Sequence, residues 1–166
     1  MPMIWNCNVL WSIRVKFYLP IILSLLFSSC AALKTDTAQL YDAYNKLSQE
    51  VKNGEIVLNR SEYFTTNYLK EVNPNDKNSL LLLKLSNYIY KDVSHYQIFN
   101  NNMGCLSING IDKNNEPLSL HVEYNKKNDA WLVNYVFLSF IENRSAYTKE
   151  AICPRDVEKS ILDKMQ

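Results

Sequence analysis

Glycine is scarce in this chain, and neither sign of charge is in excess. Only three glycines occur among 166 residues, and none belongs to a glycine-rich phosphate loop. The 18 basic residues nearly balance the 17 acidic ones, whereas a nucleic-acid partner requires a basic stripe. A Ser or Cys nucleophile motif and the His-Glu-x-x-His pattern are also missing. We therefore expect no nucleic-acid partner and no cofactor.

The N-terminal part of the chain has the three parts of a secretory leader. Arg14 and Lys16 supply positive charge, residues 17–27 are mostly apolar, and two small residues precede Cys30. The apolar run is shorter than the ~20 residues that span a bilayer. An uncleaved membrane helix extended through residues 31–33 is one alternative, and a plain secreted protein with an incidental Cys30 is another.

The end of this run, Phe27-Ser28-Ser29-Cys30, resembles the lipobox of bacterial lipoproteins. The resemblance implies cleavage before Cys30, a diacylglyceryl group on its thiol and an acyl chain such as palmitate on its new amino group. Two or more such chains hold a protein on a membrane durably. Ala31 stands where an Asp would resemble an inner-membrane retention signal. The resemblance therefore implies a lipoprotein on the periplasmic face of the outer membrane.

The leader divides the chain into three expected parts. Residues 1–29 are the expected signal peptide, residues 30–35 are the lipidated cysteine with a short tether, and residues 36–166 form a single domain. The tether reaches at most ~18 Å, so we expect the domain to sit close to the membrane. Without the leader the net charge is near −1, so acyl chains and not charge provide the attachment.

The first residues do not suit the charged start of a leader. Trp5, Cys7 and Trp11 are unusual in such a region. We therefore expect translation to begin near Val15, so that residues 1–14 are a mis-assigned start.

Two cysteines remain in the expected domain, Cys105 and Cys153. Exported domains meet oxidising compartments in which disulfides persist, so we expect these two residues to be bonded. The alternative is two unpaired buried thiols. A metal site is rejected because the two histidines, His95 and His121, add no recognisable ligand spacing.

Apolar residues recur at helical spacing in the first part of the domain. They predict a helix from residue 35 or 36 to the pair Asn53-Gly54, a second helix capped by Ser61 and a third over residues 78–89. A short last helix begins at Pro154. The residues that carry these expectations are Leu40, Tyr44, Leu47, Val51, Tyr63, Phe64, Tyr68, Leu69, Leu80, Leu81, Leu83, Leu85, Tyr88, Ile89, Val157, Ile161 and Leu162.

After residue 93 the apolar period becomes alternating, which predicts antiparallel strands. In residues 117–124 the side chains of Ser119, His121 and Glu123 alternate with apolar ones, so this strand is expected to turn a polar face to solvent. Residues 131–140 are apolar on both faces and predict a central strand.

Asparagine is expected to replace glycine in turns, at residues 73–75, 100–102 and 114–115. The pair Asn109-Gly110 predicts either a bulge or a turn.

Helices followed by antiparallel strands are typical of an α+β domain. The order of elements is similar to the cone-shaped fold of the nuclear-transport-factor-like and ketosteroid-isomerase-like superfamily. The three helices and the hairpin formed by residues 116–124 and 131–135 carry this resemblance. It implies N-terminal helices packed on a curved antiparallel sheet around a pocket, with the short C-terminal helix as an addition.

Enzymes of that superfamily place an acid/base carboxylate inside the pocket, where apolar walls raise its pKa. Here Asp112, Glu116 and Asp129 belong to expected turns. His121 and Glu123 are two residues apart on the polar face, where they form either an acid/base pair or a hydrogen-bonded surface pair.

We therefore expect a non-catalytic lipoprotein that binds a ligand or a protein. Its partners are the membrane, through Cys30, and an envelope protein or a small apolar ligand. The alternative is an isomerase- or hydrolase-like enzyme. A pocket filled by Trp131, Tyr135 and Phe137 favours the first hypothesis, and an inward carboxylate or histidine in an open apolar cavity favours the second.

Overall fold

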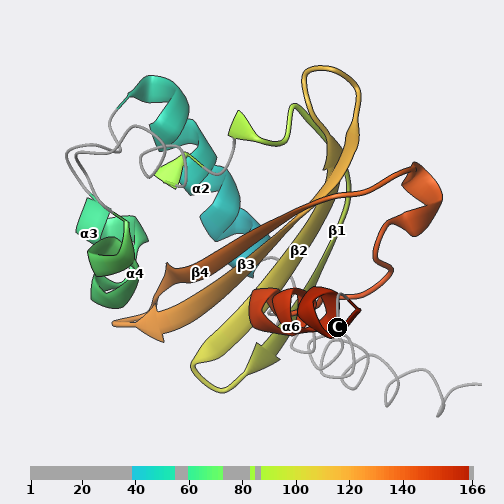
Figure 1. Cartoon of the computed structure of the whole chain (residues 1–166). Coiled ribbons are helices and arrows are strands. Elements are labelled where there is room, and N and C mark those ends of the chain that lie inside the picture. The colour runs from blue at the N-terminus through green and yellow to red at the C-terminus, as the bar shows by residue number, and fades with distance from the viewer. Residues whose placement is uncertain (1–38, 55–59, 73–82, 85–86, 165–166) are drawn as a thin grey trace, which may run out of the picture. The chain divides into compact units, whose positions relative to one another are not determined.

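A computed structural model of the chain describes residues 39–54, 60–72, 83–84 and 87–164, all of which fall in the compact unit Asp36–Gln166. The expected leader, Cys30 and most of the expected third helix lie outside the described residues. Within them, short helices precede and follow a single antiparallel sheet (Figure 1). The domain is therefore α+β.

The sheet is a four-stranded antiparallel meander in the order β1-β2-β3-β4, as far as the described residues extend. The strands span Lys91–Asn100 (β1), Met103–Ile111 (β2), Pro117–Lys127 (β3) and Ala130–Phe140 (β4). The expectation that residues 131–140 form a central strand is wrong, because β4 pairs only with β3 in this sheet and lies at its edge.

The edge strand β4 is apolar on both sides because both of its faces are covered. Val133 and Val136 pack in or against the hydrophobic core, and a C-terminal helix packs against β4 as well. Its outer edge is partly closed, since Phe64 forms a parallel bridge with Val133 and the Thr65 N–H donates to the Val133 carbonyl at 2.9 Å. A covered edge strand has the same sequence pattern as a central one.

The helices agree only in part with the sequence pattern. The first expected helix is confirmed within the described residues as α2 (Gln39–Asn53), which buries Leu40, Tyr44, Leu47 and Val51. The second is divided into α3 (Arg60–Tyr63) and α4 (Thr66–Glu71). The division lies at Thr65, whose hydroxyl oxygen accepts a hydrogen bond from the Tyr68 N–H at 3.2 Å and caps a new helix.

The C-terminal part of the chain contains a short 3-10 helix, η4 (Arg144–Ala146), and the helix α6 (Pro154–Lys164). Pro154 begins α6 as the sequence predicts, at a position where its missing N–H costs nothing. The expected apolar face of α6 is not buried along its length, because Ile161 and Leu162 near its end are exposed.

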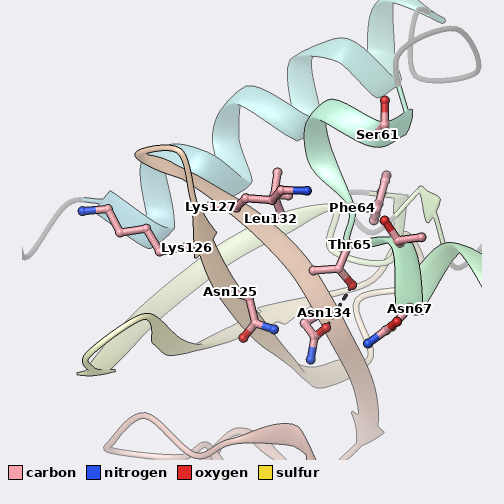
Figure 2. A pocket seen from close by; sticks show the side chains of 10 residues that line it. Ser61, Phe64, Thr65, Asn67, Asn125, Lys126, Lys127, Leu132 and Asn134 are labelled. Carbon is pink, nitrogen blue, oxygen red and sulfur yellow. Dashed lines mark hydrogen bonds between the residues drawn. The ribbon is translucent and has the colours of Figure 1, made fainter.

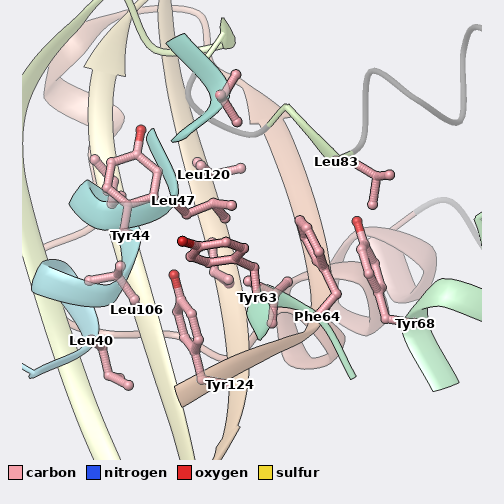
Figure 3. Packing of buried hydrophobic residues seen from close by; sticks show 14 of the residues in the cluster. Leu40, Tyr44, Leu47, Tyr63, Phe64, Tyr68, Leu83, Leu106, Leu120 and Tyr124 are labelled. Atoms are coloured by element: carbon pink, nitrogen blue, oxygen red, sulfur yellow. The ribbon is translucent and has the colours of Figure 1, made fainter. Parts of the chain in front are cut away.

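One face of the sheet and the helices α2, α3 and α4 enclose the hydrophobic core (Figure 3). β2 and β3 contribute alternate residues to it, and the helices contribute both leucine and aromatic side chains. The largest side chains that are fully buried are those of Tyr124, Phe64, Leu40, Leu47, Leu83, Leu106, Ile108, Leu118, Leu120, Val122 and Val133. Their alternation along β2 and β3 leaves every other residue on the opposite face of the sheet.

Asparagine is the turn residue of this domain. Asn101, Asn115 and Asn128 have positive φ angles of 52°, 66° and 49°. The expectation is therefore confirmed for residues 100–102 and 114–115, whereas residues 73–75 lie outside the described part. Asn is one of the few residues other than glycine that adopt this conformation at low cost.

The pair Asn109-Gly110 lies inside β2, so the turn alternative is wrong. The irregularity lies in the strand opposite, where Asp92 pairs with Gly110 and Ser94 pairs with Asn109. Val93 is therefore an extra residue in β1, as in a β-bulge.

Substitution of Gly110 by Ala should destabilise the domain more than substitution of Gly104. A Cβ atom at Gly110 would lie 2.8 Å from the backbone carbonyl oxygen of Lys91, which is fixed in the β1 ladder. At Gly104 the nearest atom is Cδ1 of Leu40, at 2.7 Å, which is the end of a side chain and can shift more easily than a strand backbone. We expect a loss of about 2 kcal/mol for Gly110→Ala and of less than about 1 kcal/mol for Gly104→Ala in urea unfolding. Equal losses would contradict this assignment.

Candidate functional site

The sheet face opposite the core carries a row of polar side chains, here named the polar row: Ser107, Asn109, Ser119, His121 and Glu123. The expectation that this face is open to solvent is wrong, because these residues are between 0% and 6% exposed. Residues 141–164, here named the C-terminal segment, cover it. Figure 1 shows α6 of this segment on the side of the sheet opposite to α2.

Hydrogen bonds attach the C-terminal segment to the polar row. The Ser107 Oγ accepts from the Ile152 N–H at 2.9 Å and donates to the Ile152 carbonyl at 3.2 Å. The Asn109 amide donates to the Thr148 carbonyl at 2.8 Å. Because the segment around residues 148–152 is neither helix nor strand, those of its backbone groups that face the sheet need partners outside a regular ladder. The polar row supplies these partners.

A disulfide bond between Cys105 and Cys153 fixes the same segment to β2, with the two Cα atoms 5.1 Å apart. Cys105 alternates with the core residue Leu106 and therefore shares the face of Ser107. The bond brings the start of α6 over the polar row.

His121 and Glu123 share this face, but no hydrogen bond within the described residues joins them. The His121 Nδ1 lies 2.9 Å from the Ser107 Oγ. The Glu123 carboxylate accepts from the Asn134 amide at 2.6 Å, and its other oxygen lies 3.5 Å from the Arg155 Nε. The expected His121–Glu123 pair, in its catalytic or its surface form, is therefore wrong, because each residue has another partner.

A Ser–His hydrogen bond also occurs where a base activates a nucleophile. Here Ser107 has no exposed surface, and its hydroxyl is already engaged by Ile152. His121 is only 3% exposed, and its burial lowers the pKa from 6.5 to about 4, so the imidazole is neutral at pH 7. The pair is enclosed and has a structural role in this conformation.

The remaining acids serve turns, as the sequence predicts. The Asp112 carboxylate accepts from the N–H groups of Asn114 and Glu116, each at 2.8 Å. Asp129 lies 3.8 Å from the Lys126 ammonium group within the β3–β4 turn.

Trp131, Tyr135 and Phe137 do not fill a common pocket. The Trp131 Nε1 donates to the Gln39 side chain at 3.0 Å on the core side, whereas the Tyr135 hydroxyl donates to Glu158 of α6 at 2.9 Å. Glu123 pairs with Tyr135 and Tyr124 pairs with Val133, so Asn134 is an extra residue that shifts the register between them. The core side is filled instead by the side chains seen in Figure 3.

A hollow of about 400 Å³ opens where the α3–α4 connection meets β3 and β4 (Figure 2). Its base contains the buried side chains of Phe64 and Leu132. The other residues that line it are polar or basic: Ser61, Thr65, Thr66, Asn67, Asn125, Lys126, Lys127 and Asn134. We name this hollow the edge pocket. It is large enough for a small ligand, and no carboxylate lines it.

The edge pocket was not found from the sequence because distant segments build it. The Thr65 hydroxyl donates to the Asn134 side-chain oxygen at 2.9 Å, across 69 residues of sequence. Figure 2 shows this bond between the α3–α4 connection and β4. The helix break at Thr65 and the extra residue Asn134 together form this wall of the edge pocket. Neither feature produces an apolar periodicity in the sequence from which the pocket could have been predicted.

Comparison with known protein families, with curated proteins and with solved structures gives no match to this chain. Within the described ranges, no helix is long and apolar enough to cross a membrane. The same residues contain no group of three or more His, Cys, Asp or Glu side chains placed to hold a metal ion.

Removal of the disulfide by Cys153→Ser should lower the free energy of unfolding by about 4 kcal/mol, because the bond closes a loop across a sequence separation of 48. Urea unfolding of the purified protein measures this loss. Cys105→Ser and the double variant should lose the same amount, since all three lack one and the same bond. Free thiols at Cys105 and Cys153 in the folded wild-type protein, identified by alkylation and peptide mass analysis, would contradict the assignment.

Stability should fall with acid partly because of His121. The pKa of His121 is about 4 in the folded chain and has its ordinary value of 6.5 in the unfolded chain. Between these two pH values only the unfolded chain therefore binds this proton. The full contribution is present above pH 6.5 and is lost as the pH falls to about 4, with a total of about 3 kcal/mol. Urea unfolding of wild type and His121→Asn at pH 7.5 and 4.5 measures the difference between their losses. A His121 ring signal that titrates near pH 6.5 in the folded protein would contradict this prediction.

Proposed function

We propose that the chain is an exported lipoprotein, anchored by acyl chains on Cys30, whose domain binds a ligand or a protein beside the membrane and does not catalyse a reaction. The observation that carries this proposal is the Cys105–Cys153 disulfide in the domain that follows the lipobox-like Phe27-Ser28-Ser29-Cys30. Such bonds persist in exported proteins and are rare where thiols are kept reduced.

The length of the chain between Cys30 and α2 supports a position close to the membrane. Gln39, the first described residue of α2, follows Cys30 by nine residues, which span at most ~32 Å when extended. This reach keeps the domain close to the membrane, and Ala31 after the anchor favours the periplasmic face of the outer membrane.

The burial of the acid/base side chains supports a non-catalytic role. General acid/base chemistry needs a titratable group within hydrogen-bond reach of a substrate. Among the described residues, His121 and Glu123 have the sequence pattern for this role, and the C-terminal segment covers both. The edge pocket, in contrast, presents amide, hydroxyl and ammonium groups to solvent, which suits binding.

We also propose that the helices and the sheet have the cone-like arrangement that the order of elements resembles. Contacts of α2 with β1, β2 and β4 agree with helices that pack on one face of the sheet. In this arrangement the volume that serves as a pocket in the cone-shaped superfamily is occupied by core side chains, so that binding takes place at the edge of the domain and not inside it.

Cys30→Ser should remove the acyl mass and release the protein from membranes or leave an uncleaved precursor. Intact-mass analysis of the membrane and soluble fractions, after expression of the complete chain in a bacterium, measures both effects. Cys153→Ser, which removes a cysteine outside the leader, is the control and should leave acylation unchanged. An acylated, membrane-bound Cys30→Ser protein would overturn the assignment.

A further inference from the structure

The edge pocket has one basic side chain that is not neutralised. The Lys126 ammonium lies 3.8 Å from the Asp129 carboxylate and 5.7 Å from the centre of the Trp131 ring. Lys127 makes no ion pair within the described residues. Figure 2 shows the Lys127 ammonium on the side of Leu132 and Phe64, whereas the Lys126 ammonium points away from them. Lys127 is therefore the cation that faces the pocket.

Hydrogen-bond donors surround this cation. Ser61, Thr66, Asn67 and Asn125 line the pocket, and none of their side chains is hydrogen-bonded to another residue in the described part of the chain. Thr65 and Asn134 bond to each other, which fixes the wall between them. The nearby Glu123 carboxylate accepts from Asn134 and is matched by Arg155.

We propose that the edge pocket binds a phosphate group, with Lys127 as the cation and the amide and hydroxyl groups of Ser61, Asn67 and Asn125 as donors. Charge-assisted hydrogen bonds to oxyanions are stronger than neutral ones, and a lining without carboxylates does not repel an anion. This inference deepens the proposed binding role and rests on it.

The phosphate group can come from two sources in the proposed location. A lipoprotein domain beside the membrane meets phospholipid headgroups, each of which carries a phosphate group. A phosphate-bearing solute of the same compartment presents the same group.

The test compares Lys127 with Lys149, an exposed lysine of the C-terminal segment that does not line the pocket. Complete protein is prepared in non-ionic detergent micelles and titrated with inorganic phosphate, while the side-chain amide signals of Asn67 and Asn125 are followed by nuclear magnetic resonance. Lys127→Gln should weaken binding at least about 10-fold, and Lys149→Gln, which makes the same charge change outside the pocket, less than about 2-fold.

A second arm distinguishes the sources. The protein is placed in phospholipid nanodiscs, whose headgroups carry phosphate, and in the non-ionic micelles, which carry none. A headgroup ligand shifts the Asn125 signals in the nanodiscs without added phosphate, and a solute ligand shifts them only when phosphate is added. In both cases the shift should disappear in Lys127→Gln.

Equal weakening in both lysine variants, or no shift in either arm, would overturn the proposal. Failure of the lipoprotein assignment is recognised separately, by the absence of acyl mass on Cys30. In that case the phosphate titration in micelles still tests the edge pocket, because it does not depend on the acyl anchor.

Discussion

The burial of the polar row under the C-terminal segment is the constraint on which the rest of the structure depends. Polar side chains that are buried need hydrogen-bond partners, and so do the backbone groups of a covering segment without helix or strand where they face the sheet. Ser107 and Asn109 provide such partners to Ile152 and Thr148. The two central strands are therefore covered on both sides, by apolar contacts on one face and mainly by hydrogen bonds on the other.

The contact between the polar row and the C-terminal segment explains why the polar face of β3 is not exposed to solvent. Alternation in β3 correctly predicted which side chains share a face, because the period of a strand is fixed by its backbone. It did not predict what covers that face. The missing signal was Cys105, which has the same parity as Ser107 and Asn109. A disulfide from Cys105 to Cys153 has to bring the C-terminal segment over this face, so the burial of His121 followed from a bond that was itself expected from the sequence.

Other features depended on information that a local pattern does not contain. The helix α2 and the Asn turns were predictable, because helical period and positive φ are local properties. The edge position of β4 was not, since its apolar outer side reflects α6 and the bridge from Phe64 to Val133. The edge pocket combines a helix break at Thr65 with an extra residue at Asn134, and only the folded chain brings them together.

The meander order of the strands has a consequence for the order in which the domain assembles. Each strand pairs with its neighbour in sequence, so the sheet and the core on its α2 side use hairpins that close quickly. The C-terminal segment is synthesised after all four strands, and its link to Cys105 needs an oxidant. The sheet therefore exposes the polar row to water until this segment covers it. A face of Ser, Asn, His and Glu tolerates this interval, whereas an apolar face in the same place would invite aggregation.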